Sequence, residues 1–257
     1  MEQIPKVGAL YCLYGEEPWL EISYRSVYPA VSRIYFFVSN LPWHGPASDQ
    51  SRLLDAIGRL PDPEGKAELL RGDWTTEEEQ RTVSAAIAAN DQMLYSLIVD
   101  GDEVYDSNHL ISMFQLAASD PSVGCWHVKW FTYWKALKFR INPLEPYDPP
   151  VLLRNGAGEF VRNRNIVAAK HRLIPPEICM CHHLSYVRSD EVMRAKHIMV
   201  PGHSHSAIAG WYENVWKRWD SDHSLTNLHP VNPPQYERAV QQPRDLLPPL
   251  LQPLWDQ

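Results

Sequence analysis

The first half of the chain alternates short apolar runs with segments of helical spacing, and this order constrains the fold more than any other feature. The runs at 7–14, 33–40, 66–74 and 95–100 have the length and residue types of strands. Helix-like patterns or helix-start signals lie around 16–31, 51–60, 75–90 and 107–119. Strands that alternate with helices predict an α/β fold with a mostly parallel central sheet flanked by helices.

The second half has a different character. The stretch 123–141 is aromatic and basic, which predicts two strands or one bent strand. Residues 151–165 have the pattern of a hairpin with Gly156 and Gly158 at its turn, and 177–187 reads as a strand. Seven prolines follow His229, so we expect irregular chain there. The predicted organisation is one domain at 1–228 and a proline-rich tail at 229–257, packed on the domain or extending from it.

Charge and hydropathy exclude some classes of protein. A net charge of −7 provides no basic surface for nucleic acid. The chain has no 18-residue apolar run and no charged-then-apolar leader at its start, so we expect no transmembrane segment and a cytoplasmic protein. Its hydrophobic fraction of 44% is sufficient for a sizeable core.

Three carboxylates are crowded at the end of the predicted strand 95–100. The apolar residues 97–99 run directly into Asp100, Gly101, Asp102 and Glu103. Neighbouring carboxylates repel one another unless a positive group lies among them. In open parallel sheets, ligands bind beyond the carboxyl ends of strands, and Mg²⁺ is held by carboxylates and substrate phosphates. If the chain is extended, Asp100 and Asp102 face one side and Glu103 the other. The pattern indicates a metal–diphosphate site; a solvated loop capping the helix at Ser107 is the alternative.

The segment LIVDGDEVY (97–105) resembles the metal-binding DxD region of GT-A glycosyltransferases, especially the family-2-like branch. Residues 11–39 resemble the opening of that branch, and 71–90 resemble the stretch before its DxD strand. Later matching blocks are 182–196, 210–219 and 227–234, so the resemblance covers about residues 7–235. Two positions depart from it: Gly15 stands where many relatives have Asn, and Ser39-Asn40 ends the second strand where the common family has an Asp that helps hold the nucleoside.

The resemblance implies a GT-A-like fold and a hexosyltransferase that moves a sugar, with inversion, from a UDP- or GDP-type nucleotide-sugar donor to a hydroxyl acceptor such as a glycan. It implies Mn²⁺ or Mg²⁺ as cofactor, with Asp100, Asp102 and His183 as ligands. The candidate donor-binding residues are Glu16, Asp73, Arg81, Asp100, Arg188 and Lys196. An Asp or Glu would take the acceptor proton. The candidates for this base are Asp148 and Asp190, with Glu145 and Glu177 also open.

The cysteines and aromatic residues permit further interpretations. Structural zinc sites use ligand pairs spaced by two to four residues, whereas only Met180 separates Cys179 from Cys181, and Cys12 and Cys125 form no second pair in sequence. Small buried residues are therefore the expectation for the cysteines. An aromatic band could be an acceptor platform or core packing; it consists of Trp126, Trp130, Tyr133 and Trp134.

Two other classes of function fit the same residues. A metal-dependent nucleotidyltransferase or hydrolase could use the same carboxylates and histidines. A non-catalytic domain that binds sugar nucleotides would keep the fold without turnover. The product formed, or the absence of one, distinguishes these classes from a glycosyltransferase.

Overall fold

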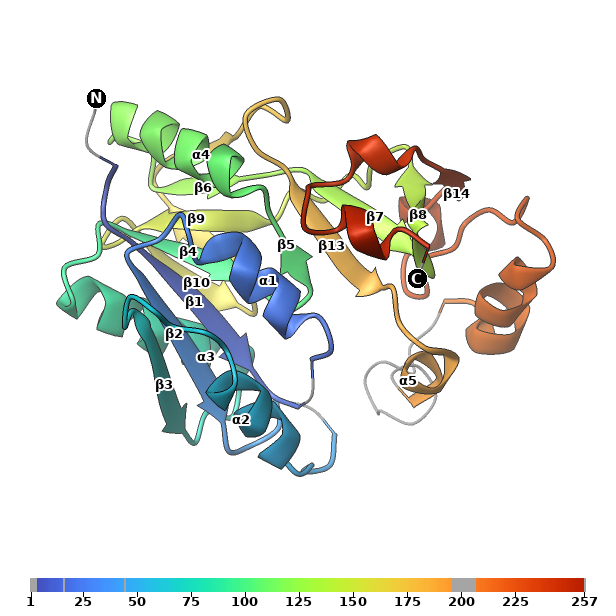
Figure 1. Cartoon of the computed structure of the whole chain (residues 1–257), viewed down its shortest axis with the longest axis horizontal. Helices are drawn as coiled ribbons and strands as arrows, with labels where there is room; N and C mark the ends of the chain where they lie inside the picture. The colour runs from blue at the N-terminus through green and yellow to red at the C-terminus, as the bar shows by residue number, and fades with distance from the viewer. Residues whose placement is uncertain (1–3, 16, 44, 196–206, 257) are drawn as a thin grey trace. The chain divides into compact units, whose positions relative to one another are not determined.

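The computed structural model describes residues 4–15, 17–43, 45–195 and 207–256. The chain forms two compact units (Figure 1). The first unit contains most of the described chain up to Lys129, together with 148–181. The second unit contains 130–147 and the described residues from His182 onward.

The first unit contains the predicted alternation of strands and helices. In chain order its elements are β1 (Val7–Leu13), α1 (Leu20–Val27), β2 (Arg33–Ser39), α2 (Ser51–Gly58), β3 (Ala67–Gly72), α3 (Glu77–Asn90), β4 (Tyr95–Val99), β5 (Glu103–Val104), α4 (Ser107–Ser119), β6 (Cys125–His127), β9 (Pro150–Arg154), β10 (Gly158–Arg162), β11 (Asn165–Ala168) and β12 (His171–Leu173).

The central sheet has the strand order β12-β6-β9-β4-β1-β2-β3. Strand β1 is parallel to both β2 and β4, and β2 is parallel to β3. Strand β9 lies antiparallel between β4 and β6, and β6 is parallel to β12. The predicted α/β class, with a mostly parallel central sheet flanked by helices, is confirmed.

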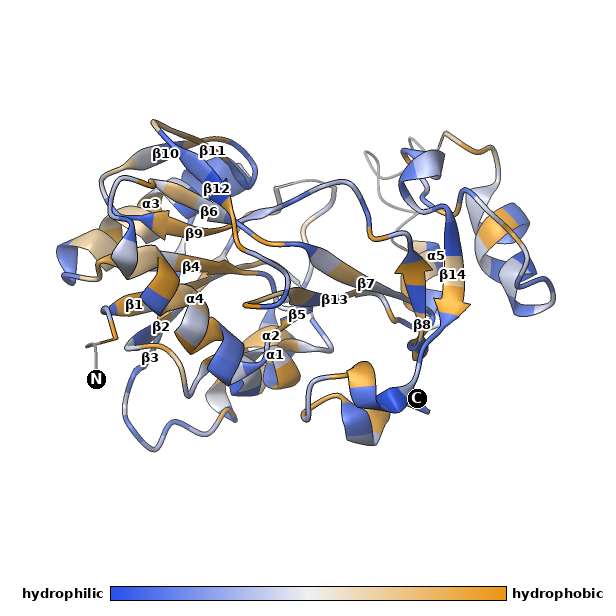
Figure 2. Ribbon diagram, turned by 90° about the horizontal axis from the view of Figure 1, so that it is seen from above, coloured by the Kyte–Doolittle hydropathy of each residue, from blue (hydrophilic) through white to orange (hydrophobic). Residues whose placement is uncertain are grey.

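The apolar strands bury both faces of the sheet against helices. On one face, Leu10 and Phe37 pack with residues of α3. On the other face, Tyr11 and Phe36 contact each other, and Tyr24 of α1 packs on Phe36. Side chains alternate between the faces of a strand, so β1 and β2 supply hydrophobic residues to both sides. Figure 1 shows α1 and α3 on opposite faces, and Figure 2 shows hydrophobic residues along these strands.

The second unit is built around an aromatic core. Its strands lie in the order β14 (Arg238–Gln241), β8 (Ala136–Asn142), β7 (Trp130–Trp134) and β13 (Cys181–Tyr186). A short helix α5 (Asp190–Arg194) and a π-helical turn η2 (Tyr212–Lys217) follow β13. Trp134 stacks on Tyr186, and Trp216 packs edge-on against Trp134. These rings and their neighbours form one buried cluster.

The tail differs from the predicted irregular segment. Strand β14 pairs antiparallel with β8. Residues 235–242 contain no proline, so their backbone N–H groups can join a ladder between the flanking prolines. The Gln242 side-chain amide donates to the Leu137 carbonyl at 2.7 Å. The described residues from His229 onward therefore belong to the second unit, together with 130–147.

Two local predictions were wrong. Strand β9 joins the central sheet, so β10 pairs with β11 instead, through a turn in which Asn163 has φ of 50°. The stretch 123–141 forms three strands, because Lys135 takes a left-handed conformation between β7 and β8 and the chain leaves the first unit after β6. Helix α4 is capped by the Asp106 side chain, which accepts from the backbone N–H groups of Asn108 and His109.

The described helices all fall short of the length and apolarity needed to cross a membrane.

Candidate functional site

The carboxyl ends of β1 and β4 form the switch point of the sheet. The chain runs outward from β1 through β2 to β3 and then returns to place β4 on the other side of β1. Ligands of open α/β sheets bind beyond the strand ends at such a point. Here Glu17, shortly after β1, lies against Gly101, shortly after β4: a Cβ at Gly101 would overlap the Cγ atom of Glu17. The glycine therefore permits close approach of the two segments.

The acidic segment after β4 is a tight turn, which we call the acidic turn (Asp100–Glu103). The Glu103 backbone N–H donates to the Asp100 carbonyl at 3.0 Å, and the Glu103 carboxylate accepts from the Asp100 N–H at 3.1 Å. The extended geometry expected for Asp100 and Asp102 was therefore wrong, because the chain reverses within these four residues. Asp102 occupies a central turn position and is 8% exposed.

Arg164 supplies the positive charge that the acidic turn requires. It follows Asn163 in the turn between β10 and β11. Its Nη1 lies 2.9 Å from an Asp100 oxygen and also contacts Glu103, whose other oxygen accepts from Nη2 at 3.0 Å. The remaining donors reach backbone carbonyls, from Nη2 to Ile98 at 3.1 Å and from Nε to Pro150 at 3.0 Å. The guanidinium is thus held in place by both side-chain and backbone acceptors.

Arg81 of α3 is the second arginine that contacts Asp100. Its Nη2 donates to the second Asp100 oxygen at 2.7 Å, and its Nε donates to Glu77 at 2.8 Å. Burial opposes the charged form of Arg81, but Asp100 and Glu77 raise its pKa above the ordinary value. Burial raises the pKa of Glu103, whereas the Arg164 guanidinium lowers it. The two arginines favour ionised carboxylates in a buried setting.

The predicted donor-binding residues occupy several places. Asp73 follows β3 at the same carboxyl edge of the sheet, and its exposed carboxylate accepts from Asn40 at 2.7 Å. Arg81 and Asp100 are brought together directly. Arg188 lies in the second unit, where its Nε donates to the Ser185 carbonyl at 3.1 Å. Glu16 and Lys196 lie outside the described residues.

The two candidate bases differ in their surroundings. Asp148, in the first unit, pairs with Lys129 at 2.6 Å. Asp190, in the second unit, accepts from Lys217 at 2.7 Å and from the Trp216 indole N–H at 2.8 Å. The hydrogen bond from Lys217 is the main cause that lowers the pKa of Asp190, with burial opposing it.

His183, the predicted third metal ligand, lies in the second unit. Its ring stacks on Trp130 with centroids 4.1 Å apart, and its Nδ1 lies 3.3 Å from the Thr132 hydroxyl. The neighbouring His182 is buried, with Nδ1 2.6 Å from the Tyr133 hydroxyl. Coordination by His183 to a metal at Asp100 and Asp102 stays a prediction.

The aromatic band is divided between core and surface. Trp126, Tyr133 and Trp134 are completely buried, so the packing alternative is correct for them. Trp130 is half-buried and carries His183 on its face.

Sequence reasoning did not identify Arg164. The repulsion among the carboxylates required a positive partner, but Arg162 and Arg164 both lie in the predicted hairpin. Only the structure distinguishes them: Arg162, at the end of β10, is exposed, and Arg164, in the turn before β11, is buried.

Comparisons with known proteins give matches among solved structures. No protein-family model matches the chain, and no curated protein matches it. TarS of S. aureus matches at 13% identity and a TM-score of 0.43, over 74% of this chain and 38% of that chain. GalNAc-T7, solved with UDP, GalNAc and Mn²⁺, matches at 9% identity and a TM-score of 0.47, over 72% and 45%. A mycobacterial protein matches at 12% identity and a TM-score of 0.35, over 50% and 42%. The chain spans less than half the length of each of these three.

Replacing Arg164 by Met is expected to destabilise the protein by about 3–5 kcal/mol, because Glu103 would remain buried without its cation. Urea unfolding followed by circular dichroism measures this loss. The exposed Arg162→Met is the matched control and should change the free energy of unfolding by about 0.5 kcal/mol or less. Equal stability of the two variants would contradict the role given to Arg164.

Proposed function

We propose that the chain is a metal-dependent glycosyltransferase that moves a sugar from a nucleotide-sugar donor of the UDP or GDP type to a hydroxyl acceptor such as a glycan. The acidic turn at the switch point of the sheet carries this proposal. It joins the DxD resemblance of the sequence to a position where open α/β sheets bind nucleotides. Inversion and hexosyl specificity are part of the proposal and follow from the same resemblance.

The charge balance at the acidic turn supports a divalent cation. The guanidiniums of Arg81 and Arg164 contact three carboxylates, those of Asp100, Glu103 and Glu77, and Asp102 adds a fourth carboxylate in the same turn. Carboxylates outnumber guanidiniums among these groups, and carboxylates repel a diphosphate. A divalent cation held by Asp100 and Asp102 would offset that charge and supply positive charge to a bound diphosphate.

The available donors fit Mg²⁺ or Mn²⁺. Asp100 and Asp102 offer carboxylate oxygens, which hard divalent cations prefer. The Asp100 side chain is 34% exposed although its arginine partners are buried, so one side of it faces solvent. Glu103 is fully buried and bonded to Arg164, so we assign it the task of holding the turn. Asp100 and Asp102 would hold the cation, and His183 is proposed as a further ligand.

The bound cation would stabilise negative charge on the departing diphosphate. Arg81 and Arg164 orient Asp100 from two directions, which fixes the carboxylate before a ligand arrives. The acceptor hydroxyl must lose a proton, for which we propose Asp148 ahead of Asp190. The hydrogen bond from Lys217 lowers the pKa of Asp190, which disfavours that carboxylate as a proton acceptor.

A nucleoside diphosphate is expected to bind more tightly with Mn²⁺ or Mg²⁺ than with a chelator, because the cation removes the repulsion described above. Calorimetric titration of UDP and GDP in both conditions tests this. Equal affinities with and without the metal would count against a metal-bridged diphosphate.

Asp102→Asn is expected to fold and to lose most transferase activity, because the amide keeps the shape and removes the charge that binds the cation. Circular dichroism checks the fold, and release of nucleoside diphosphate with transfer to an acceptor measures activity. Glu159→Gln, at an exposed site on β10, is the carboxylate control and should retain activity. Free sugar or pyrophosphate as the main product would indicate a hydrolase or nucleotidyltransferase. Donor binding without turnover would indicate a binding domain.

His183→Ala is expected to weaken Mn²⁺ binding, whereas His182→Ala should leave it nearly unchanged in molecules that fold. His182 is buried beside Tyr133, so its removal acts on packing of the second unit. Paramagnetic resonance of free Mn²⁺ measures affinity, and thermal unfolding separates the stability effect. A reversed pattern, with His182 the sensitive position, would defeat the assignment of His183.

A further inference from the structure

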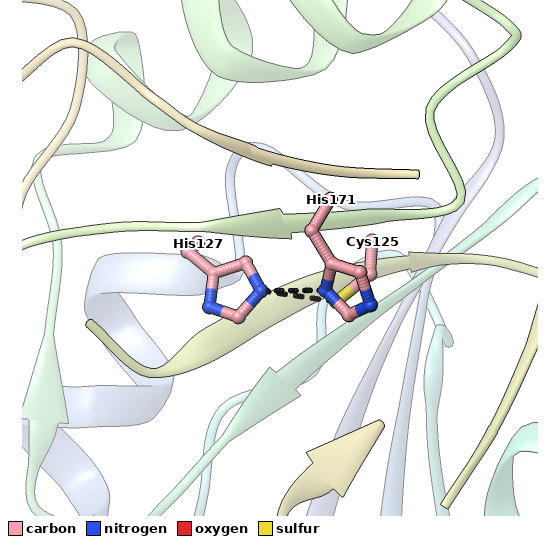
Figure 3. A group of neighbouring side chains, drawn as sticks. All are labelled: Cys125, His127 and His171. Atoms are coloured by element: carbon pink, nitrogen blue, oxygen red, sulfur yellow. Dashed lines mark hydrogen bonds between the residues drawn. The ribbon is translucent and has the colours of Figure 1, made fainter. Parts of the chain in front are cut away.

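A second group of side chains that could bind a metal lies on β6 and β12. It consists of one cysteine and two histidines, whereas the carboxylate site is built from Asp and Glu. Cys125 and His127 are two residues apart on β6 and therefore point to the same face of the sheet. His171 begins β12 and is the register partner of Cys125 in the parallel pair. Figure 3 shows the two imidazole rings facing each other, with the Cys125 sulfur beside them.

The distances are close to those of a tetrahedral site. His127 Nε2 lies 2.9 Å from His171 Nδ1 and 3.7 Å from the Cys125 sulfur. The three ligand atoms all lie within 4.8 Å of one another. Tetrahedral zinc with ordinary bond lengths separates two nitrogens by about 3.3 Å and a nitrogen and a sulfur by about 3.6 Å. The spacing of His127 Nε2 and Cys125 Sγ already matches zinc, and a movement of the exposed His171 ring by about 0.4 Å would bring the two nitrogens to their zinc spacing.

Hydrogen bonds prepare His127 as a ligand. Its Nδ1 lies 2.8 Å from the Asp148 backbone carbonyl, which can only accept, so Nδ1 carries the proton in the neutral ring. The lone pair of Nε2 then points toward His171 and Cys125. Metal-bound histidines are commonly oriented by such a bond from their other nitrogen.

Without metal, the group forms a chain of hydrogen bonds. His171 Nδ1–H donates to His127 Nε2, and His171 Nε2 accepts from the Ala168 backbone N–H at 3.3 Å. A metal would replace the proton between the two rings. That proton moves to His171 Nε2, which faces solvent, and the long bond from Ala168 is given up to water.

We propose that Cys125 Sγ, His127 Nε2 and His171 Nδ1 form a Zn²⁺ site whose fourth position is taken by water. The Cys125 thiol releases one proton as its sulfur binds, and the His171 proton shifts within the ring. Thiolate and imidazole donors select zinc over Mg²⁺, which prefers oxygen. The site ties β12 to β6 at the edge of the central sheet.

Burial sets the strength of the site. Cys125 is fully buried, and desolvation raises the pKa of its thiol to about 12, with Arg164 opposing the rise. Zinc must therefore displace a firmly held proton, which reduces apparent affinity at neutral pH. The ligand set shares no residue with Asp100, Asp102 or His183, so the zinc site stands or falls independently of the proposed transferase.

Zinc binding is measured on the full chain by equilibrium dialysis against Zn²⁺ in excess Mg²⁺, followed by metal analysis. His171→Ala removes an exposed side chain and should fold normally, and it should weaken zinc binding by about tenfold or more. His109→Ala, at an exposed histidine of α4, is the matched control and should bind as the wild type does. Asp102→Asn should also retain the zinc.

Co²⁺ provides a second readout, because a thiolate ligand gives cobalt a charge-transfer absorption that nitrogen and oxygen ligands do not. The wild-type Co²⁺ complex should show this absorption, and Cys125→Ser should lose it while Cys179→Ser, at another buried cysteine, should keep it. Unchanged zinc affinity in His171→Ala would overturn the proposal. A wild-type cobalt complex without thiolate absorption would overturn it equally.

Discussion

The ion pair between Arg164 and the acidic turn is the interaction on which the carboxyl edge of the sheet depends. Glu103 is completely buried, and a buried carboxylate is tolerated only when it is paired and hydrogen-bonded. The same guanidinium bonds Asp100 and two backbone carbonyls, so it fixes the turn, the end of β4 and the start of β9 together. The site geometry is therefore a property of four chain segments joined by one side chain.

The segment 148–181 contributes a residue to each of two groups in the first unit, the acidic turn and the Cys125–His127–His171 group. It supplies Arg164 to the acidic turn and His171 to Cys125 and His127. It can do so because β9 runs antiparallel between β4 and β6, which returns the chain across the sheet and leads into β10, β11 and β12. The antiparallel strand β9 thus interrupts the alternation of strands and helices, and the chain that follows it brings Arg164 and His171 to these two groups.

The alternation of apolar runs and helical patterns predicted the parallel part of the sheet, because burial on both faces dictates continuous apolar strands. The end of β4 before the carboxylates was also predicted, since aspartate is a poor strand former. Arg164 could not be predicted, because its partners are 61 and 64 residues away and no spacing rule connects them. The Cys125–His127–His171 group was missed for the same reason: β12 lies beside β6 only after the chain has folded. The alternation of side chains along a strand also gave a wrong orientation for Asp100 and Asp102, because these residues lie in a turn and not in extended chain.

The distance in sequence between the acidic turn and Arg164 imposes an order on folding. Asp100 and Glu103 leave the ribosome about sixty residues before Arg164. Until β10 and β11 dock, Glu103 lacks its ion pair with Arg164 and is better solvated by water than by the protein. The β1–β4 layer can collapse early through nearer contacts, whereas the turn above it must stay hydrated. Assembly of the site is therefore a late event, completed by the hairpin that brings Arg164.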